Sequence, residues 1–260
     1  MRAAPALHQI SLDGALFRSG IQQAAAVADE PILGIVHGQA LTFVVLKGGG
    51  LVLSWRFPLP QGVDGSFIFG VPPMISGHLV AQPTLGAGAV HLALNGPEVT
   101  LAANDAAGSY ELRWRFDLNT FPAPPDLSRL LVPPEALVSA EYLQVADAIH
   151  SAVARLVRIE REGQLHRTNL AIVLALSNGD LLIEAQEITM WEQGCYYFDP
   201  RLVMRSLECI RGLQVWVGLT ALGPRRAFFS LVDRQPDRLT HCALLSIGQD
   251  TQRLISPSAR

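Results

Sequence analysis

The sequence predicts an α+β protein of two tandem repeats, each with two helices packed on antiparallel sheets. The first observation behind this class is an order of hydrophobic patterns (helix, strands, helix, strands) that occurs twice along the 260 residues. The second is the nearly constant offset between the copies, which is 129 residues when Gly65 is aligned with Gly194 and 125 when Val90 is aligned with Val215. The two copies therefore differ mainly in short loops.

The first repeat contains two expected helices, a long one at about 12–28 and a short apolar one at 71–81. Alternating or apolar runs bounded by turn residues predict seven strands, at 32–37, 41–47, 50–57, 65–71, 90–95, 98–104 and 109–116. Short turns with Gly or Asn separate many of these runs, as antiparallel hairpins require.

The second repeat follows the same order, with expected helices at about 136–158 and 199–211. Six strands are expected, at 169–176, 180–187, 194–198, 213–220, 226–233 and 240–248. Helical periodicity in the long helix predicts a buried apolar stripe formed by Val138, Tyr142, Val145, Ile149, Val153 and Leu156.

A proline-rich segment separates the repeats. Five prolines between residues 117 and 136 prevent helix continuation and central-strand pairing, so an extended linker is expected there. The predicted organisation is a first domain at 1–118, a linker at 119–135 and a second domain at 136–260.

The stretch YYFDPRLVMRSLECI at 196–210 predicts a strand that leads directly into a helix. Asp199 is a favourable N-cap residue, and Pro200 suits the first helical position. The apolar face of this helix consists of Val203, Leu207 and Ile210. Its outer face consists of Arg201, Arg205 and Glu208.

The composition indicates a globular protein without a strongly basic surface. Hydrophobic residues make up 49% of the chain and charged residues 17%, and the formal net charge is −3. Nucleic-acid-binding proteins are more often plainly basic, so any basic surface must be local. The cysteines Cys195, Cys209 and Cys242 form no CxxC pair, which disfavours a disulfide framework and a zinc site. With no signal-peptide pattern and no apolar run of about 20 residues, a soluble cytoplasmic protein is expected.

The sequence contains no motif of an enzyme, a metal centre or a cofactor site. The KGGG stretch at 47–50 lacks the order of a phosphate-binding loop and predicts a hairpin turn instead. The seven histidines show no HxxxH or HExxH spacing, and no Gly-x-Ser-x-Gly motif is present. We therefore expect a protein that is not an enzyme and that has no catalytic residues, no metal and no cofactor.

Three stretches resemble the DNA sliding clamps, especially the clamp of bacterial replicative polymerases. Residues 196–220 are similar to the clamp pattern of a strand, a helix started by Asp or Asn, and another strand. Residues 90–125 are similar to the last three strands of a clamp domain and its Phe-Pro-x-x-Pro exit. HCALLSI at 241–247 lies where bacterial clamps have their final strand. The resemblance implies a DNA-clamp fold of two domains.

The resemblance also implies a ring. Clamp rings contain six such units, with helices lining the hole and sheets forming the outer wall. Bacterial clamps carry three units per chain and form dimers, whereas the two-unit chains of eukaryotes and archaea form trimers. Two units in this chain imply three copies in a closed ring.

The DNA-facing residues that the resemblance implies are Arg155, Arg158, Arg201, Arg205 and Arg211. With Arg18, the four candidate helices carry six basic residues, against five acidic ones: Asp13, Glu141, Asp147, Asp199 and Glu208. Lysine is absent from these helices, and Lys47 is the only lysine of the chain. Because each phosphate contact releases a counterion, so sparse a lining predicts weak, salt-sensitive, non-specific contact with duplex DNA. A solvated helix face is the alternative interpretation of Arg201 and Arg205.

Clamps bind short peptides of polymerases and repair proteins in an apolar groove beside the last strand. By position, Leu245 and Ile247 correspond to groove residues. Bacterial clamps usually have Met-Pro-Met there, and Leu245, Ser246 and Ile247 keep the apolar character without the proline. Burial of both apolar residues in the core of the last strand is the alternative interpretation.

The function that follows from the resemblance is a homo-oligomeric ring around duplex DNA, acting as a non-catalytic processivity or tethering factor in DNA replication. The alternative is a clamp-fold scaffold or protein-binding module that does not encircle DNA, which the nearly neutral lining favours. Neither function requires a membrane.

Overall fold

The computed structural model describes residues 8–47, 50–105, 108–121, 127–135, 137–161, 170–177, 180–187, 196–223 and 226–247. The chain divides into two compact units. Unit 1 comprises Met1–Lys47, Ser54–Pro125 and Pro236–Leu239. Unit 2 comprises Gly48–Leu53, Asp126–Gln235 and Thr240–Arg260.

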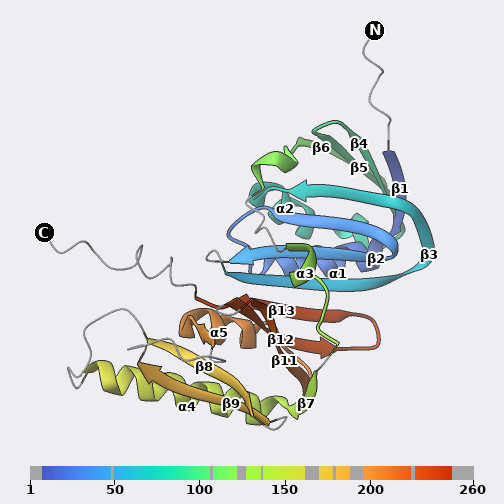
Figure 1. Ribbon diagram of the computed structural model, residues 1–260. Helices are drawn as coiled ribbons and strands as arrows, with labels where there is room; N and C mark the ends of the chain where they lie inside the picture. Colours follow the sequence, from blue (N-terminus) through green and yellow to red (C-terminus); the bar gives the residue numbers. More distant parts are fainter. Residues whose placement is uncertain are drawn as a thin grey trace, which may run out of the picture. The chain divides into compact units, whose positions relative to one another are not determined.

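Unit 1 contains an antiparallel sheet in the order β1-β4-β5-β6 and a pair of long strands, β2 and β3 (Figure 1). Its elements are β1 (His8–Asp13), α1 (Gly14–Ala25), β2 (Ile32–Lys47), β3 (Leu51–Val71), α2 (Pro73–Val80), η1 (Pro83–Gly86), β4 (Ala89–Asn95), β5 (Glu98–Asp105), β6 (Gly108–Arg115) and η2 (Leu118–Thr120). In the core, the ring of Phe17 from α1 packs against Phe43 of β2 and Phe69 of β3, with ring centroids 5.7 and 6.3 Å away.

Unit 2 contains a sheet with strands in the order β7-β11-β12-β13 and a second sheet in the order β10-β8-β9. Its elements are α3 (Leu127–Leu130), β7 (Val138–Glu141), α4 (Tyr142–Arg161), β8 (Leu170–Ser177), β9 (Asp180–Glu187), β10 (Tyr196–Phe198), α5 (Pro200–Glu208), β11 (Gln214–Gly223), β12 (Arg226–Arg234) and β13 (Leu239–Leu245). Phe198 and Phe229 are buried in its core and pack edge to face.

The two units repeat one topology, so the predicted α+β class and tandem repeat are confirmed. The order β1-β4-β5-β6 of unit 1 corresponds strand by strand to β7-β11-β12-β13 of unit 2. Val90 lies opposite Leu12 in the first sheet, and its counterpart Val215 lies opposite Ala140 in the second. The buried residues of α1 (Phe17, Ile21 and Ala24) match those of α4 (Val145, Ile149 and Ala152) at a single offset of 128 residues.

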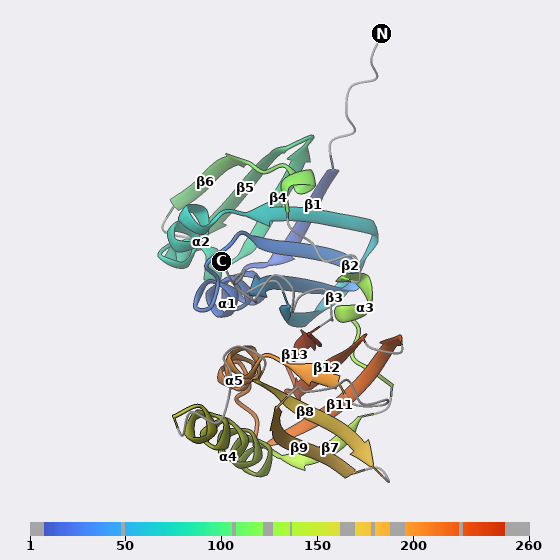
Figure 2. The same ribbon diagram turned by 60° about the vertical axis from the view of Figure 1, so that its left-hand side comes forward.

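Each unit carries its two main helices on one side of its strands. Figure 2 shows α1 beside α2 within unit 1, and the two helices are in contact. Within unit 2, α4 lies beside α5 in the same way, and these helices are also in contact. Among the described residues, no helix is long and apolar enough to cross a membrane.

Both long helices begin later than expected, because a short strand precedes each of them. The expected helix at 12–28 starts at Gly14, and Asp13 ends β1 while its carboxylate caps the helix by accepting from the Leu16 N–H at 2.9 Å. The expected helix at 136–158 starts at Tyr142, because 138–141 pair with β11 as strand β7. Val138, placed in the buried stripe of the helix, is therefore in a strand and 43% exposed. Tertiary pairing overrides the helix preference of these few residues.

The expected strands at 32–37 and 41–47 are one continuous strand, β2, and the run at 65–71 is the end of β3. Gly38, within β2, has a φ of 56°, a conformation that glycine adopts without steric penalty, so the strand continues through this residue. The linker is not extended throughout, since η2 forms a helical turn before its first proline and α3 forms another between its third and fourth prolines. Residues 48–49 of the expected hairpin turn lie outside the described residues.

Candidate nucleic-acid interface

Helix α5 is built as the sequence predicts. The side chains of Tyr197 and Phe198 are buried at the end of β10, and the chain then turns into the helix. The carboxylate of Asp199 accepts a hydrogen bond from the Arg201 N–H at 2.8 Å, and Pro200 occupies the first helical position, where no N–H is needed. This cap fixes the start of the helix and with it the direction in which its side chains point.

The two faces of α5 are separated as expected. The residues that form its apolar face and the following turn are buried, namely Val203, Leu207 and Ile210. The opposite face presents exposed charged side chains, namely Arg201, Arg205 and Glu208. Two arginines one helical turn apart on an exposed face can contact neighbouring phosphates of a polyanion.

Arg211 follows α5 in a turn that a buried carboxylate holds in place. Asp233 of β12 is 1% exposed, and its Oδ2 accepts hydrogen bonds from the backbone N–H groups of Arg211 (3.2 Å) and Gly212 (3.1 Å). Its Oδ1 accepts from the Gln235 side-chain amide at 2.7 Å. A Cβ on Gly212 would overlap the Asp233 carboxylate, so any other residue there requires that carboxylate to move. The exposed side chain of Arg211 is thus presented by a rigid turn.

Sequence reasoning missed Asp233. Its position could have indicated it. Asp233 follows Phe229 and Leu231 at a spacing of two residues, so all three side chains point to the same side of an apolar strand. A charged side chain at such a position must be hydrogen-bonded. In this fold its partners are the backbone donors of the turn after α5.

Helix α4 adds Arg155 to the same unit. Val145, Ile149 and Ala152 face the core, whereas Arg155 lies on the exposed side of the helix. Gln144, Asp147 and Ser151 of the same helix are also exposed. Arg158 belongs to the same helix, but its side chain lies outside the described residues.

Exposed basic side chains outnumber exposed acidic ones around the helices of unit 2, within the described part. Around α4 and α5, the exposed basic side chains are Arg155, Arg201, Arg205 and Arg211. The exposed acidic side chains on these two helices, within the described part, are Asp147 and Glu208. Glu141, counted as a helix residue from the sequence, is in strand β7. Asp199 is at the N-terminus of α5, where its charge is balanced by the helix dipole.

The corresponding face of unit 1 lacks these arginines. Helices α2 and α5 can be aligned at Pro73 and Pro200, which lie in their first turns. The buried positions of the two helices then coincide as well. Arg201 then corresponds to Met74, which is 88% exposed, and Arg205 corresponds to the exposed His78. On α1, Arg18 is the sole charged residue, and its guanidinium lies over the backbone of Gly86 rather than in open solvent.

Leu245 and Ile247, the expected groove residues, are both half-buried at the end of β13. The N–H of Leu245 donates to the Gly50 carbonyl at 2.8 Å, and the N–H of Ile247 donates to the Tyr197 carbonyl at 2.7 Å. Ser246 between them is buried, and its hydroxyl accepts from the Ala227 N–H at 2.9 Å. Because side chains alternate along an extended chain, Leu245 and Ile247 point away from Ser246, toward the side that is partly open.

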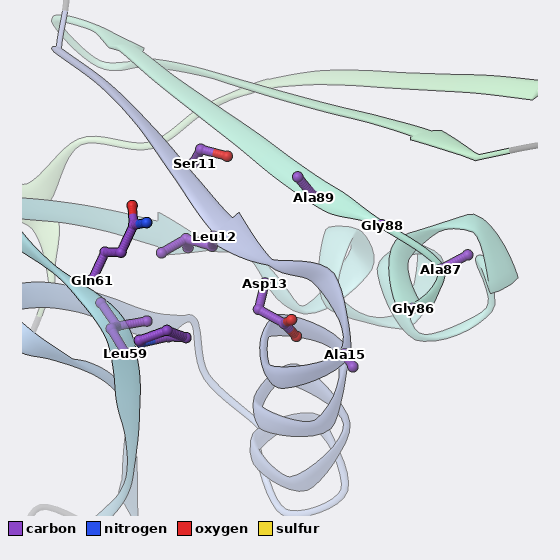
Figure 3. A pocket seen from close by; sticks show the side chains of 11 residues that line it. Ser11, Leu12, Asp13, Ala15, Leu59, Gln61, Gly86, Ala87, Gly88 and Ala89 are labelled. Atoms are coloured by element: carbon purple, nitrogen blue, oxygen red, sulfur yellow. The ribbon is translucent and has the colours of Figure 1, made fainter.

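A pocket of about 430 Å³ lies in unit 1 at the start of α1 (Figure 3). The side chains of Asp13 and Gln61 reach its wall, and the loop of Gly86–Ala89 closes one side. Asp13 is the single titratable residue among those that line it, and its carboxylate already caps α1. The pocket therefore brings together no acid–base pair of the kind that catalysis uses.

Solved structures with the same architecture are DNA polymerase sliding clamps. The fold is that of a sliding clamp. The clamp of Pseudomonas aeruginosa is 15% identical and has a TM-score of 0.59, over 95% of this chain and 67% of that chain. The DNA polymerase III beta subunit of Thermotoga maritima is 12% identical with a TM-score of 0.57, over 95% and 67% of the two chains. The beta subunit from the DNA polymerase of Streptococcus pyogenes is 14% identical with a TM-score of 0.58, over 96% and 68%.

The chain with this clamp fold spans about two thirds of the length of the clamps it matches. No protein-family model matches the sequence, and no curated protein matches it. At 12–15% identity the three comparisons establish the fold, as the sequence resemblance predicted.

Proposed function

We propose that the protein is a non-catalytic tethering factor that assembles around duplex DNA and contacts the phosphate backbone with the helical face of unit 2. This face consists of Arg155, Arg201, Arg205 and Arg211, and the side chain of Arg158 would extend it. The observation that carries the proposal is the outward placement of Arg201 and Arg205 on a helix whose opposite face is buried. Exposed arginines on a rigid helix attract phosphate without reading sequence, which is what a sliding protein needs.

The proposed assembly is a ring of three copies, because two clamp units per chain need three chains to supply six units. Edge strands are the natural joining elements, since their unpaired backbone groups can extend a sheet in a second chain. Among the described strands, β6 of unit 1 and β9 of unit 2 each pair on one side alone. Size-exclusion chromatography with light scattering tests this assembly. A trimer supports it, and a monomer at every concentration contradicts it.

The proposed partner site is the surface of Leu245 and Ile247, which would bind apolar peptides of polymerases or repair proteins. Gly50, beside Leu245, has no side chain to occupy the neighbouring space, and the nearest side-chain atom to a Cβ built there is Leu202 Cδ1 at 3.5 Å. Replacing Ile247 by Asp is expected to abolish peptide binding in a fluorescence titration, because it puts an unpaired carboxylate into an apolar contact. Asp at the exposed Leu213 of the same unit is the matched control and leaves binding unchanged.

DNA contact is tested by the salt dependence of binding to a fluorescently labelled duplex. Each arginine–phosphate contact contributes about 0.9 to the slope of log K against log salt. The double variant Arg201→Gln plus Arg205→Gln is therefore expected to lower the slope by about 2. Between about 50 and 200 mM salt, this change makes the loss of affinity about tenfold smaller than in the wild type.

The matched control for this experiment is Arg56→Gln plus Arg115→Gln, which removes the same charge from exposed strand positions of unit 1. We expect the control to keep the wild-type slope. Two outcomes contradict DNA contact by the arginines of α5. In the first, the helix variant keeps the wild-type slope, and in the second, the helix variant and the control lower the slope by the same amount.

The second candidate function is a clamp-fold scaffold that binds proteins and does not encircle DNA. The observation that favours it is the presence of Met74 and His78 in unit 1 where unit 2 has arginines, which leaves half of the helical surface with little charge. This function is supported if the protein is a monomer that binds an apolar peptide through Ile247 but does not bind duplex DNA at low salt. A trimer that binds DNA contradicts it.

A further inference from the structure

Two cysteines far apart in the sequence meet at the end of helix α5. Cys209 is the residue that ends the helix, and Cys242 is in strand β13. The Cys209 thiol donates to the Arg205 carbonyl at 3.8 Å, and the Cys242 thiol donates to the carbonyl of the next residue, Ser206, at 3.5 Å. The Cys209 side chain is also close enough to the Cys242 thiol to act on its protonation. Neither cysteine is in a disulfide, and the residues are 9% and 1% exposed.

We propose that Cys209 and Cys242 form a redox modification site, in which a peroxide converts the two thiols into a disulfide that joins α5 to β13. In the first step the Cys209 sulfur attacks hydrogen peroxide, the O–O bond breaks, and Cys209 becomes a sulfenic acid with release of water. In the second step the Cys242 sulfur attacks the sulfenic sulfur, the S–O bond breaks, and a second water leaves. Two thiols are oxidised and one peroxide is reduced.

The surroundings assign the two roles. Cys209 is the more exposed thiol, so a small oxidant reaches it first. Cys242 is almost fully buried, and the neighbouring Cys209 side chain, together with burial and the nearby charge of Asp233, raises the pKa of its thiol well above the usual range. A thiol held protonated is a poor nucleophile toward peroxide, so Cys242 is not the first to be oxidised. The sulfenic sulfur of Cys209 is an electrophile beside it, and the Cys242 proton leaves with the sulfenic hydroxyl as water. The pair therefore stays reduced until peroxide is supplied.

The disulfide would lie close to both functional surfaces proposed above. Helix α5 carries Arg201 and Arg205, and β13 ends at Leu245. Forming the bond withdraws both thiols from the carbonyls of the last turn of α5, so oxidation changes the end of the helix that presents Arg205. The disulfide itself does not depend on DNA binding and can form whether or not the tethering function is correct.

The test is peptide mapping of the full chain after treatment with hydrogen peroxide, alkylation of the remaining thiols, and trypsin digestion without reductant. Cleavage after arginine places Cys209 in SLECIR and Cys242 in LTHCALLSIGQDTQR. We expect one linked species, two hydrogens lighter than the sum of the peptides, which dithiothreitol separates. The linked protein runs as a monomer on a denaturing gel, because the bond is within one chain.

Two variants complete the experiment. Cys195→Ser is expected to form the same link, whereas Cys242→Ser is expected to leave Cys209 as a sulfenic acid that a dimedone probe labels. The proposal is overturned if wild-type Cys209 and Cys242 are both recovered alkylated, if the link contains Cys195, or if it joins two chains. The wild-type map alone decides the question should the Cys242 variant fail to fold.

Discussion

Acid should destabilise unit 2 through one buried histidine. His241 of β13 is fully buried, and its Nε2 is hydrogen-bonded to the hydroxyl of Ser230 on β12 at 3.0 Å. Burial disfavours the charged imidazolium and lowers the pKa of His241 from 6.5 to about 4. The folded protein therefore holds this side chain neutral over a pH range in which the unfolded chain protonates it.

This difference in protonation sets the sign and the size of the change in the free energy of unfolding with pH. Well above pH 6.5 both states are neutral and the full stability is present. As the pH falls through 6.5, the unfolded state binds more protons than the folded state, and the free energy of unfolding falls. The loss reaches about 0.8 kcal/mol at pH 6, about 2 kcal/mol at pH 5 and about 3 kcal/mol at pH 4. Below the folded-state pKa the loss stays nearly constant, because both states are then protonated.

The assay is urea unfolding of the wild type and His241→Gln at pH 7.5, 6, 5 and 4. Glutamine can still hydrogen-bond to Ser230 but does not titrate, so the variant should lose less stability than the wild type by the amounts given above. Carboxylates present in both proteins, Asp233 among them, cancel in the difference. His150→Gln, at an exposed position of α4, is the matched control and should follow the wild type. A His241 variant with the full pH dependence of the wild type would refute the reasoning.

Three further substitutions test the geometry of α5, each by urea unfolding at neutral pH. Asp199→Ala removes the cap and should cost about 1 kcal/mol, with Asp199→Asn near the wild type; equal values for both would contradict a capping role. Leu207→Ala should cost about 2–5 kcal/mol, whereas Glu208→Ala on the exposed face should change stability by less than about 0.5 kcal/mol. Gly212→Ala forces a methyl group against Asp233 and should cost about 1–3 kcal/mol, and an unchanged midpoint would show that the turn has room.

The parts of the fold that depend on local periodicity could be predicted from the sequence. Helix α5 was predictable because Asp199 and Pro200 fix its start and the spacing of Val203 and Leu207 fixes its buried face. The short strands β1 and β7 were not, because six and four residues give little alternation and their pairing partners lie about 80 residues along the chain. Strand formation at such sites is decided by the neighbouring strand.

The sequence predicted which arginines of the candidate interface are exposed, but not the balance of basic and acidic side chains around them. The outward positions of Arg201 and Arg205 follow from helical spacing, and the structure has them exposed. The nearly neutral count included Asp13, Glu141 and Asp199, which the structure places directly before a helix rather than within one. The support of Arg211 by Asp233 joins residues 22 apart through backbone donors, and no side-chain pattern encodes such a contact.

The two repeats share the character of their buried residues but differ at exposed positions of their second helices. Ile149 repeats Ile21 and Ala152 repeats Ala24, because the interior of each unit admits little change in shape without loss of stability. The exposed positions of the second helix have no such constraint, and Arg201 stands in one unit where Met74 stands in the other. Exchanging surface side chains alters stability little but changes the charge that a partner meets. A duplex that contacts this chain would therefore meet two units of one fold with unequal electrostatic character, and the arginines of α5, not the fold, would decide how strongly it is held.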